Sequence, residues 1–292
     1  MENKTIKKKR TKTITLSVIG IALVLLIVWI AWGNNALELN SYSIASNSLP
    51  KEFDGFRIAQ VSDLHNAEMG KDNEKLISML ADAEPDIIVI TGDMIDSRNT
   101  KVDVALAFAE QAVKIAPCYY VTGNHEARVD EYSDLKDGLI ELGVTVLEDA
   151  KTEMACSGES IVLVGVSDPS FQTDYLFGDD ETVLNSKLNE LISEEDGYVI
   201  LLSHRPELFD TYVENKVDLI FSGHAHGGQF RIPFIGGVVA PNQGLFPKFD
   251  AGIYTEGNTN MVVSRGVGNS IIPFRVNNRP EVILIELTTQ GE

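Results

Sequence analysis

Residues 86–93, DIIVITGD, decide the fold class of this chain. Every residue from Ile87 to Thr91 is β-branched, and a continuous apolar run of this length is typical of a strand buried on both faces. The Gly-Asp pair that follows marks a turn carrying a carboxylate. Similar runs recur along the chain, and we expect buried strands over 57–63, 118–124, 160–168, 198–204, 218–223, 260–266 and 281–287.

Helical patterns lie between several of these runs, over 73–83, 102–115 and 183–192. Strands that alternate with helices and end in a strand-rich tail predict an α/β fold with a largely parallel first sheet. The segment ALELNSYSI, residues 36–44, predicts an opening strand at the edge of that sheet.

Most of the predicted strands end in polar side chains that suit a metal ion or its surroundings. In open α/β sheets, ligands gather at the carboxyl ends of the strands, so residues far apart in sequence meet at one rim. All five histidines of the chain belong to this set. The joint placement therefore predicts a metal centre, with candidates Asp63, His65, Asp93, Asp96, Asn124, His125, Glu126, His204, His224 and His226.

The stretch GHAHGGQ, residues 223–229, places two of these histidines one residue apart between glycines. On an extended backbone alternate side chains point the same way, so we expect His224 and His226 to converge on one face. The flanking glycines would let backbone and ligand approach closely.

Each candidate taken alone has a structural alternative. A lone histidine is more often a satisfied core residue, and Gly-Asp is more often only a turn. Asp96 and Glu126 would either orient ligand histidines or cap loops. Arg205 would either contact a phosphate oxygen or be an ordinary surface arginine, and Arg265 and Arg275 are weaker candidates for the same contact.

The spaced blocks D-x-H (63–65), G-D-x-x-D (92–96), G-N-H-E (123–126), His204 and G-H-x-H (223–226) resemble the signature of the calcineurin-like metallophosphoesterases. That resemblance covers about residues 36–287 and implies two packed mixed sheets flanked by helices. Residues 227–237 and 263–287 are similar to a membrane-anchored bacterial branch, one that resembles UDP-diacylglucosamine pyrophosphatase-like and phospholipid-directed phosphodiesterases.

The resemblance also implies two metal ions and assigns their ligands. One ion would take Asp63, His65, Asp93 and His226, and the other Asp93, Asn124, His204 and His224. Asp93 would bridge the two ions, and His125 would face the substrate without binding metal. Imidazole and carboxylate ligands suit Mn, Fe or Zn, whereas the lack of thiolate ligands argues against a closed structural zinc site.

Charge narrows the predicted chemistry. Two divalent ions, two aspartates and a bridging hydroxide leave a net charge of about +1, which suits a phosphodiester or a pyrophosphate. In-line attack by that hydroxide, with His125 either protonating the leaving oxygen or stabilising developing charge, is the predicted reaction. The alternatives are a phosphomonoesterase and a catalytically idle metal-binding module for surface interactions. A G-x-S-x-G elbow for serine hydrolase chemistry is absent from the sequence.

The N-terminal segment predicts a membrane anchor. Residues 1–12 hold six basic side chains and one acidic one, and the 20 residues of 13–32 carry no charge. Such a helix spans about 30 Å, the thickness of a bilayer core. Trp29 and Trp32 stand at its outer end. The positive-inside rule predicts a cytoplasmic tail, a single-pass signal anchor over 13–32 and an extracytoplasmic catalytic domain over 36–292.

A cleaved secretory signal is the alternative for this segment, but its apolar region is usually only about 7–15 residues long.

Beyond residue 12 the chain has 18 basic and 42 acidic residues, a net charge of −24 that disfavours nucleic acid as a partner. We expect a small phosphodiester or a lipid phosphate as substrate.

Two loops and two cysteines complete the predictions. Residues 227–246 would either admit an acyl chain beside a membrane or pack as a hairpin on their own core. Residues 169–181 would overhang the site. Cys118 lies in an apolar run, which favours a buried free thiol over a disulfide with Cys156.

Overall fold

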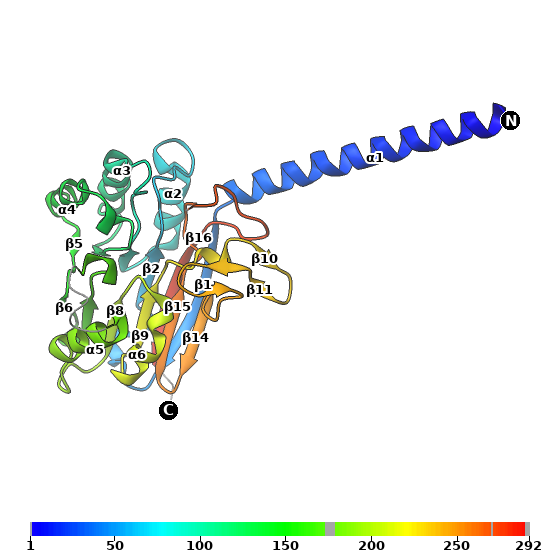
Figure 1. Cartoon of the computed structure of the whole chain (residues 1–292). Coiled ribbons are helices and arrows are strands. Elements are labelled where there is room, and N and C mark those ends of the chain that lie inside the picture. Colours follow the sequence, from blue (N-terminus) through cyan, green and yellow to red (C-terminus); the bar gives the residue numbers. More distant parts are fainter. Residues whose placement is uncertain (1, 173–178, 270, 290–292) are drawn as a thin grey trace.

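The computed structural model describes residues 2–172, 179–269 and 271–289, and it confirms the predicted α/β class. Two six-stranded mixed sheets pack face to face (Figure 1). In the first sheet β1 is parallel to β16, β16 is antiparallel to β2, and the remaining neighbours are parallel. Its strands, in spatial order, are β1 (Glu38–Ser46), β16 (Glu281–Thr289), β2 (Arg57–Val61), β3 (Ile87–Thr91), β4 (Cys118–Val121) and β5 (Thr145–Val146).

The second sheet has a parallel interior and an antiparallel strand at each edge. Its strands, in spatial order, are β14 (Gly252–Glu256), β15 (Thr259–Val263), β9 (Leu219–Ser222), β8 (Val199–Leu202), β7 (Glu159–Gly165) and β6 (Ala150–Cys156). Every predicted strand therefore has a counterpart in one of the two sheets, and the segment 36–44 forms the predicted edge strand, β1.

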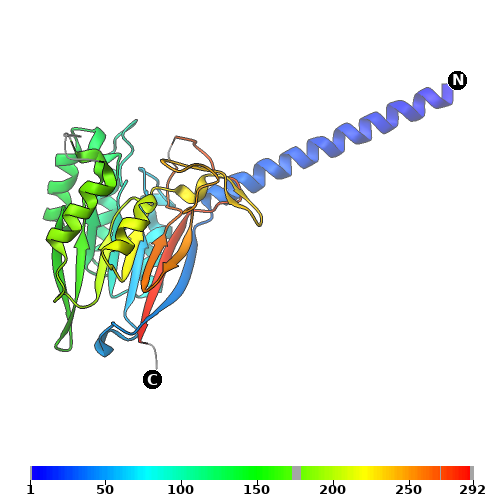
Figure 2. The same cartoon turned by 60° about the horizontal axis from the view of Figure 1, so that its bottom comes forward.

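Helices cover the outer face of each sheet (Figure 2). Strand β3 shows why its sequence is apolar throughout: Ile88 and Ile90 pack toward the helices, whereas Val89 packs between the sheets. The first sheet is covered by α2 (Glu74–Ala83), α3 (Val102–Ala112) and α4 (Tyr132–Glu141), and the second by α5 (Asp180–Leu191) and α6 (Phe209–Glu214). Short 3-10 helices include η3 (Glu126–Arg128), η4 (Pro169–Phe171), η6 (Pro206–Leu208) and η7 (His226–Gly228).

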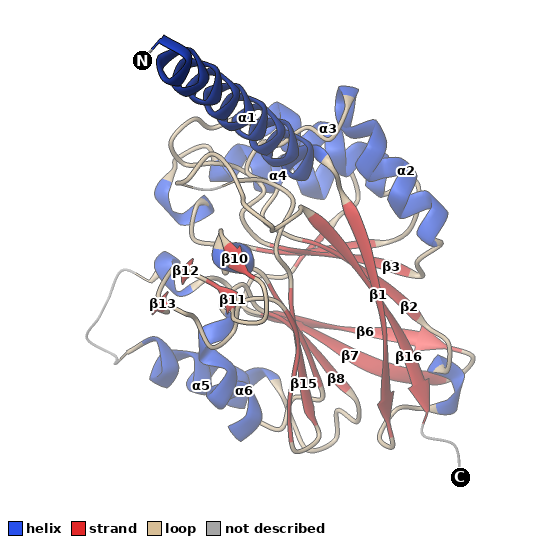
Figure 3. Cartoon of the chain, turned by 90° about the vertical axis from the view of Figure 1, so that its right-hand side faces the viewer, coloured by secondary structure: helices blue, strands red, loops and turns tan. Residues whose placement is uncertain are grey.

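Helix α1 (Glu2–Asn35) projects from the body as one continuous helix (Figures 1 and 3). Its portion Thr11–Asn35 is long and apolar enough to cross a membrane, by length and composition. The small ladders β10 (Arg231–Ile232) with β11 (Gly236–Gly237), and β12 (Val239–Ala240) with β13 (Gly244–Leu245), follow η7.

Residues 227–246 form two short hairpins: Ala240 packs into a hydrophobic core, whereas Phe234, at the tip of β10–β11, is fully exposed. Both alternatives for this loop stay predictions. Of the other predicted loop, residues 173–178 lie outside the described part of the chain. Cys118 is buried, and both Cys118 and Cys156 are free thiols.

Candidate metal centre

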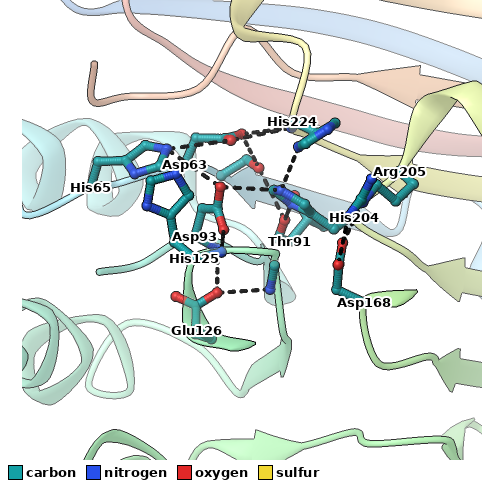
Figure 4. A network of polar contacts seen from close by, with 12 residues as sticks. Asp63, His65, Thr91, Asp93, His125, Glu126, Asp168, His204, Arg205 and His224 are labelled. Atoms are coloured by element: carbon teal, nitrogen blue, oxygen red, sulfur yellow. Dashed lines mark hydrogen bonds and ion pairs between the residues drawn. The ribbon is translucent and has the colours of Figure 1, made fainter. Parts of the chain in front are cut away.

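The candidate ligands lie where strands of the two sheets end, so the packing of the sheets brings them together. Asp63 and His65 follow β2, and Asp93 follows β3. His204 follows β8 in the opposing sheet, and His224 follows β9. All of these side chains, together with Asn124, His125 and His226, are buried. Figure 4 shows Asp63, His65, Asp93, His204 and His224 facing one another.

The first group consists of four residues whose ligand atoms lie within 4.8 Å of one another: Asp63, His65, Asp93 and His226. His65 Nε2 lies 3.2 Å from His226 Nε2 and 3.5 Å from Asp93 Oδ2. His226 Nε2 lies 3.3 Å from Asp63 Oδ1. Two imidazoles and two carboxylates thus face a common point.

The second group shares one residue with the first: it consists of Asp93, His204 and His224. His204 Nε2 lies 3.3 Å from Asp93 Oδ2 and 3.2 Å from His224 Nδ1. The other nitrogen of His204, Nδ1, donates a hydrogen bond of 2.7 Å to the Thr91 carbonyl, so Nε2 is the nitrogen that faces Asp93.

A single oxygen of Asp93 connects the two groups. Oδ1 accepts a hydrogen bond of 2.8 Å from the backbone N–H of His125. Oδ2 is thereby left facing His65 on one side and His204 on the other. This is the arrangement that a carboxylate shared between two cations requires.

Asp63 is held by close packing against the GHAH turn. Ser62 Oγ donates to its Oδ2 at 2.6 Å, and the backbone N–H of His224 donates to both of its oxygens at 3.1 and 3.2 Å. A side chain at Gly223 would not fit, because its Cβ would lie 1.9 Å from Ser62 Oγ. The predicted close approach at Gly223 is therefore made by the side chains of Ser62 and Asp63.

The expected convergence of His224 and His226 on an extended backbone is wrong. Strand β9 ends at Ser222, and both histidines have left-handed backbone conformations, with φ of 64° and 47°. They point into different groups, His224 toward His204 and His226 toward His65. Asp63, His65 and Asp93 also have positive φ, and strained backbone of this kind gathers at functional sites.

The electrostatics of the cluster fit a bound cation. Burial, and also the charge of Asp93, raise the pKa of Asp63 to about 6 against the opposing effect of His204. Burial alone would lower the pKa of His204, but the carboxylates, Asp93 first, raise it to about 10. The buried carboxylates therefore favour a positive charge beside them, which a protonated His204 or a bound cation supplies. Burial lowers the pKa of His65 to about 3, which leaves a neutral imidazole able to ligate.

Asn124 lies beside the second group. One end of its amide is 2.8 Å from His224 Nδ1, and the other end is 3.3 Å from the Arg128 guanidinium. If the amide nitrogen faces His224, it donates a hydrogen bond to Nδ1. If the amide oxygen faces His224, the oxygen and Nδ1 are both acceptors, and a cation bound to both would stabilise this arrangement. The position is consistent with its predicted role as a ligand.

Glu207 is a residue that the sequence patterns do not predict. Its Oε1 lies 3.9 Å from His224 Nε2, the nitrogen that faces away from His204. Neither that nitrogen nor Glu207 Oε2 has a hydrogen-bond partner among the described residues. A ligand histidine usually donates its other N–H to a carboxylate, and Glu207 is a carboxylate near this nitrogen, at a distance longer than a hydrogen bond. Its only signal in the sequence is an acidic residue shortly after a histidine that ends a strand.

The two acidic residues predicted around the ligands differ in their contacts. Glu126 is fully buried and accepts hydrogen bonds from the backbone N–H groups of Asp93 (2.9 Å), Gly123 (2.8 Å) and Ile95 (3.2 Å). It therefore fixes the ligand loops through their backbone rather than through a histidine ring. Asp96 accepts hydrogen bonds from Arg98, and its Oδ1 lies 3.6 Å from His125 Nδ1.

His125 packs against His65, with ring centroids 4.5 Å apart. Its Nδ1 lies 3.0 Å from the backbone N–H of Ser97, which can only donate. In the neutral ring Nδ1 must therefore be the acceptor, and the proton lies on Nε2. Burial lowers the pKa of His125 and favours this neutral form. The sequence patterns could not predict Ser97, because its contact with His125 uses the backbone N–H, which is not specific to serine.

The three candidate arginines are not free surface side chains. Arg205 is buried, and its Nε and Nη2 donate to Asp168 at 2.6 and 2.8 Å. Arg265 pairs with Glu281 and Glu38 at 2.7 and 2.8 Å. Arg275 is almost wholly buried, with Nη2 3.5 Å from His226 Nδ1. The surface alternative for Arg205 is therefore wrong, and its phosphate contact stays a prediction.

Fold and cluster together define a metal-dependent hydrolase of the two-sheet α/β type. The family model for calcineurin-like phosphoesterases matches residues 56–228. The uncharacterized metallophosphoesterase YkuE of Bacillus subtilis is 30% identical over 259 residues, which cover 86% of this chain and 85% of that protein. The phosphodiesterase YaeI of Escherichia coli is 27% identical over 247 residues, covering 80% and 82%.

Among solved structures, that of TT1561 from Thermus thermophilus has a TM-score of 0.50 at 16% identity, covering 73% of this chain and 90% of that one, and it shows a likeness of fold alone. The chain belongs to the calcineurin-like phosphoesterase family. It is accordingly a metal-dependent phosphoric ester hydrolase with a buried cluster of aspartate and histidine ligands.

Proposed function

We propose that this protein is a membrane-anchored phosphodiesterase or pyrophosphatase that uses two divalent metal ions. The observation that carries the proposal is the position of Asp93 Oδ2, which lies 3.5 Å from His65 Nε2 and 3.3 Å from His204 Nε2. One oxygen between two sets of nitrogen ligands is the geometry of a bridging carboxylate, and it favours two ions over one.

Each ion has four protein ligands in this proposal, and Asp93 belongs to both sets. The first is held by Asp63, His65, Asp93 and His226, and the second by Asp93, Asn124, His204 and His224. When bound, Mn, Fe or Zn ions would activate water at neutral pH and stabilise negative charge on phosphoryl oxygens. The protein contributes the ligand positions, fixed by Glu126, Ser62 and Thr91, and a site that is largely closed to solvent.

His125 acts on the leaving oxygen in this proposal. The hydrogen bond from the Ser97 N–H to Nδ1 places its proton on Nε2, and the ring lies against His65 at the edge of the first group. A donor held in this way can stabilise or protonate the oxygen that departs, an effect typically worth about 10²–10⁴-fold in rate.

The charge of the site favours a diester or a pyrophosphate over a monoester. Two ions, Asp63, Asp93 and one hydroxide sum to about +1. Arg205 lies nearby, but its Nε and Nη2 are paired with Asp168, so it offers little further positive charge to a dianionic monoester. The similarity to YaeI, which is named a phosphodiesterase, points the same way. A phosphomonoesterase and an idle metal-binding module are the alternatives.

The anchor sets the location in this proposal. The basic tail (1–12) lies in the cytoplasm, residues 13–32 cross the membrane once, and the catalytic domain (36–292) lies outside. Helix α1 supports this through its length and apolar composition. A lipid or envelope head-group phosphate would then be within reach of the site, whereas the net charge of −24 beyond residue 12 disfavours nucleic acid.

The test uses full-length protein in detergent, stripped of metal and then reloaded with Mn²⁺. Bis(p-nitrophenyl) phosphate and p-nitrophenyl phosphate serve as diester and monoester, with Asp93→Asn and, as a matched control on exposed helix α4, Asp134→Asn. We expect metal-dependent diester cleavage that Asp93→Asn abolishes and Asp134→Asn retains. Faster monoester than diester cleavage would favour the phosphomonoesterase. Metal binding without turnover of either compound would favour the idle module.

A further inference from the structure

We infer that the loops around the base of α1 form a second contact surface for the lipid bilayer, beside the anchor itself. This surface consists of exposed apolar side chains on two segments, residues 227–246 and 264–279, and we refer to Ile232, Phe234, Ile235, Ile271 and Phe274 as the apolar patch. The inference rests on the proposed anchor, because it assumes that α1 crosses the membrane.

The patch is built from two segments that are tied to each other. The backbone N–H of Arg231 donates to the Val276 carbonyl at 3.0 Å, and Gln229 Nε2 donates to the carbonyls of Ile272 and Phe274 at 2.9 and 2.6 Å. The rings of Phe230 and Phe274 also pack, with centroids 5.5 Å apart. The β10–β11 loop and the 271–276 segment therefore form one unit.

This unit is attached to the last turns of the anchor helix. Asn34 accepts a hydrogen bond of 2.7 Å from the backbone N–H of Arg275 and donates one of 2.9 Å to the Arg275 carbonyl. The Arg279 guanidinium lies 5.0 Å from the centre of the Trp32 ring, and its Nε donates to the Ala36 carbonyl at 2.7 Å. The position of the patch is thus fixed relative to the helix.

The attachment places the patch at the expected height of the membrane surface. Trp32 ends the uncharged segment, and Asn34 lies only about 3 Å further along the helix axis. Phe274 is the neighbour of the residue that Asn34 binds. The β10–β11 loop lies on the side of the body from which α1 leaves, in two views at right angles (Figures 1 and 3).

The side chains of the patch are strongly exposed for their size. Phe234 is fully exposed, Ile271 is 76% exposed and Ile235 is 65% exposed. Large apolar side chains gathered on one side of a soluble surface mark a contact site. Their burial about 5–10 Å into the head-group boundary is what an interfacial element achieves.

The distribution of charge selects a bilayer as the partner. Segments 227–246 and 264–279 contain no aspartate or glutamate, in a chain with 43 acidic residues, and their four arginines are buried or paired with acidic residues elsewhere. A carboxylate opposes burial at a membrane surface, and the two segments that carry the apolar patch contain none. The loops that surround the anchor are the part of this acidic chain that a lipid surface would accept.

The proposed contact surface also lies close to the candidate metal centre. Ligand His226 lies five residues before Arg231, and its Nδ1 faces the guanidinium of Arg275, whose backbone Asn34 binds. The metal centre is therefore one side chain away from the segment that we place against lipid. A substrate held by its acyl chains in the same leaflet would meet the site without leaving the membrane.

The experiment measures lipid contact in the full-length chain. One cysteine is added at Phe234, Ile21 or Ile140 in a Cys156→Ser background, which keeps only the buried Cys118, and the added cysteine is labelled with the fluorophore NBD; the background without an added cysteine controls for labelling of Cys118. The protein is reconstituted into phosphatidylcholine vesicles, with or without phosphatidylglycerol, that contain nitroxide-labelled lipid as the quencher. Ile21 lies in the anchor, and Ile140 on α4 is a matched exposed isoleucine (52%) on the part of the body away from α1.

We expect the label at Phe234→Cys to be quenched at least about twofold more than the label at Ile140→Cys, with the label at Ile21→Cys quenched most. If the label at 21 is quenched and that at 234 is not quenched beyond that at 140, the anchor stands and the contact surface is overturned. If the label at 21 is not quenched, the anchor and the surface both fail. A blue shift at 234 that lacks quenching and grows with the protein-to-lipid ratio would assign the patch to a second copy instead.

Discussion

The carboxylate of Glu126 accepts a hydrogen bond of 2.9 Å from the backbone N–H of Asp93, the residue shared by both ligand groups. The same carboxylate binds the N–H groups of Gly123 and Ile95, so three backbone donors from the β3 and β4 loops end on one buried side chain. The ligand geometry therefore depends on a fully buried side chain that accepts hydrogen bonds from backbone N–H groups.

Replacing Glu126 should destabilise the whole fold. Glu126→Ala leaves three buried N–H groups without an acceptor, and each unsatisfied group costs about 1–3 kcal/mol. We expect the free energy of unfolding to fall by at least about 3 kcal/mol in urea titrations of metal-free protein, and by less in Glu126→Gln, which keeps one acceptor. A loss below about 1 kcal/mol in Glu126→Ala would contradict this role.

Replacing Glu207 should weaken metal binding and leave the fold largely intact. The Glu207 carboxylate lies 3.9 Å from His224 Nε2, and loss of a carboxylate partner of a ligand histidine typically costs about 10–100-fold in metal affinity. Calorimetric titration of metal-free protein with Mn²⁺ should show that loss in Glu207→Ala and a partial recovery in Glu207→Gln, whose oxygen can still accept. Unchanged affinity in Glu207→Ala would show that His224 is oriented by other contacts.

Replacing His125 should slow reactions in proportion to the basicity of the leaving oxygen. Protonation matters little for p-nitrophenolate but strongly for an alkoxide, so His125→Ala should lower kcat about 10²–10⁴-fold with an alkyl diester and far less with the aryl diester. Steady-state kinetics on the two substrates measure this difference, with Asp134→Asn as the control. Equal losses on both substrates would assign His125 a positioning role only.

The Asp168–Arg205 pair should make stability depend on acid pH. Burial alone would raise the pKa of Asp168, but the hydrogen bonds from Arg205 outweigh it and hold that pKa below its usual value. Because the pKa is lower in the folded chain, ionised Asp168 stabilises the fold above about pH 4, and this stabilisation is lost as the pH falls through the folded pKa.

Unfolding of Asp168→Asn measures that contribution. At neutral pH the variant should lose about 3–5 kcal/mol, because Arg205 stays buried without its carboxylate. The difference from the wild type should shrink as the pH of urea titrations is lowered from about 5 to about 2. A difference that stays constant over this range would show that the cost arises from packing and not from ionisation.

The fold was largely predictable because most of its strands are buried on both faces and therefore have continuous apolar sequences. Strand β3 is buried on both faces and is β-branched throughout, and its Gly-Asp ending places Asp93 at the rim where ligands meet. Helix α6 escaped prediction because six residues are too short to show a helical period. Strand β6 is a half-exposed edge strand, AKTEMAC, without a continuous apolar run.

The candidate site was predictable in its residue types but not in its local geometry. The histidines and aspartates at strand ends indicate the ligands, yet the left-handed turn that separates His224 from His226 depends on packing against Asp63. Ser97 acts through its backbone N–H, which any residue but proline would supply. Glu207 becomes recognisable only when β8 and β9 bring it within 3.9 Å of His224.

Electron paramagnetic resonance of the full-length protein loaded with two equivalents of Mn²⁺ tests the central claim most directly. If Asp93 Oδ2 bridges two ions, their spins must couple, and the spectrum should show the broad multiline pattern of an exchange-coupled pair. Asp93→Asn should lose that pattern. A simple six-line spectrum from the wild type, or saturation at one ion per chain, would contradict a dinuclear centre.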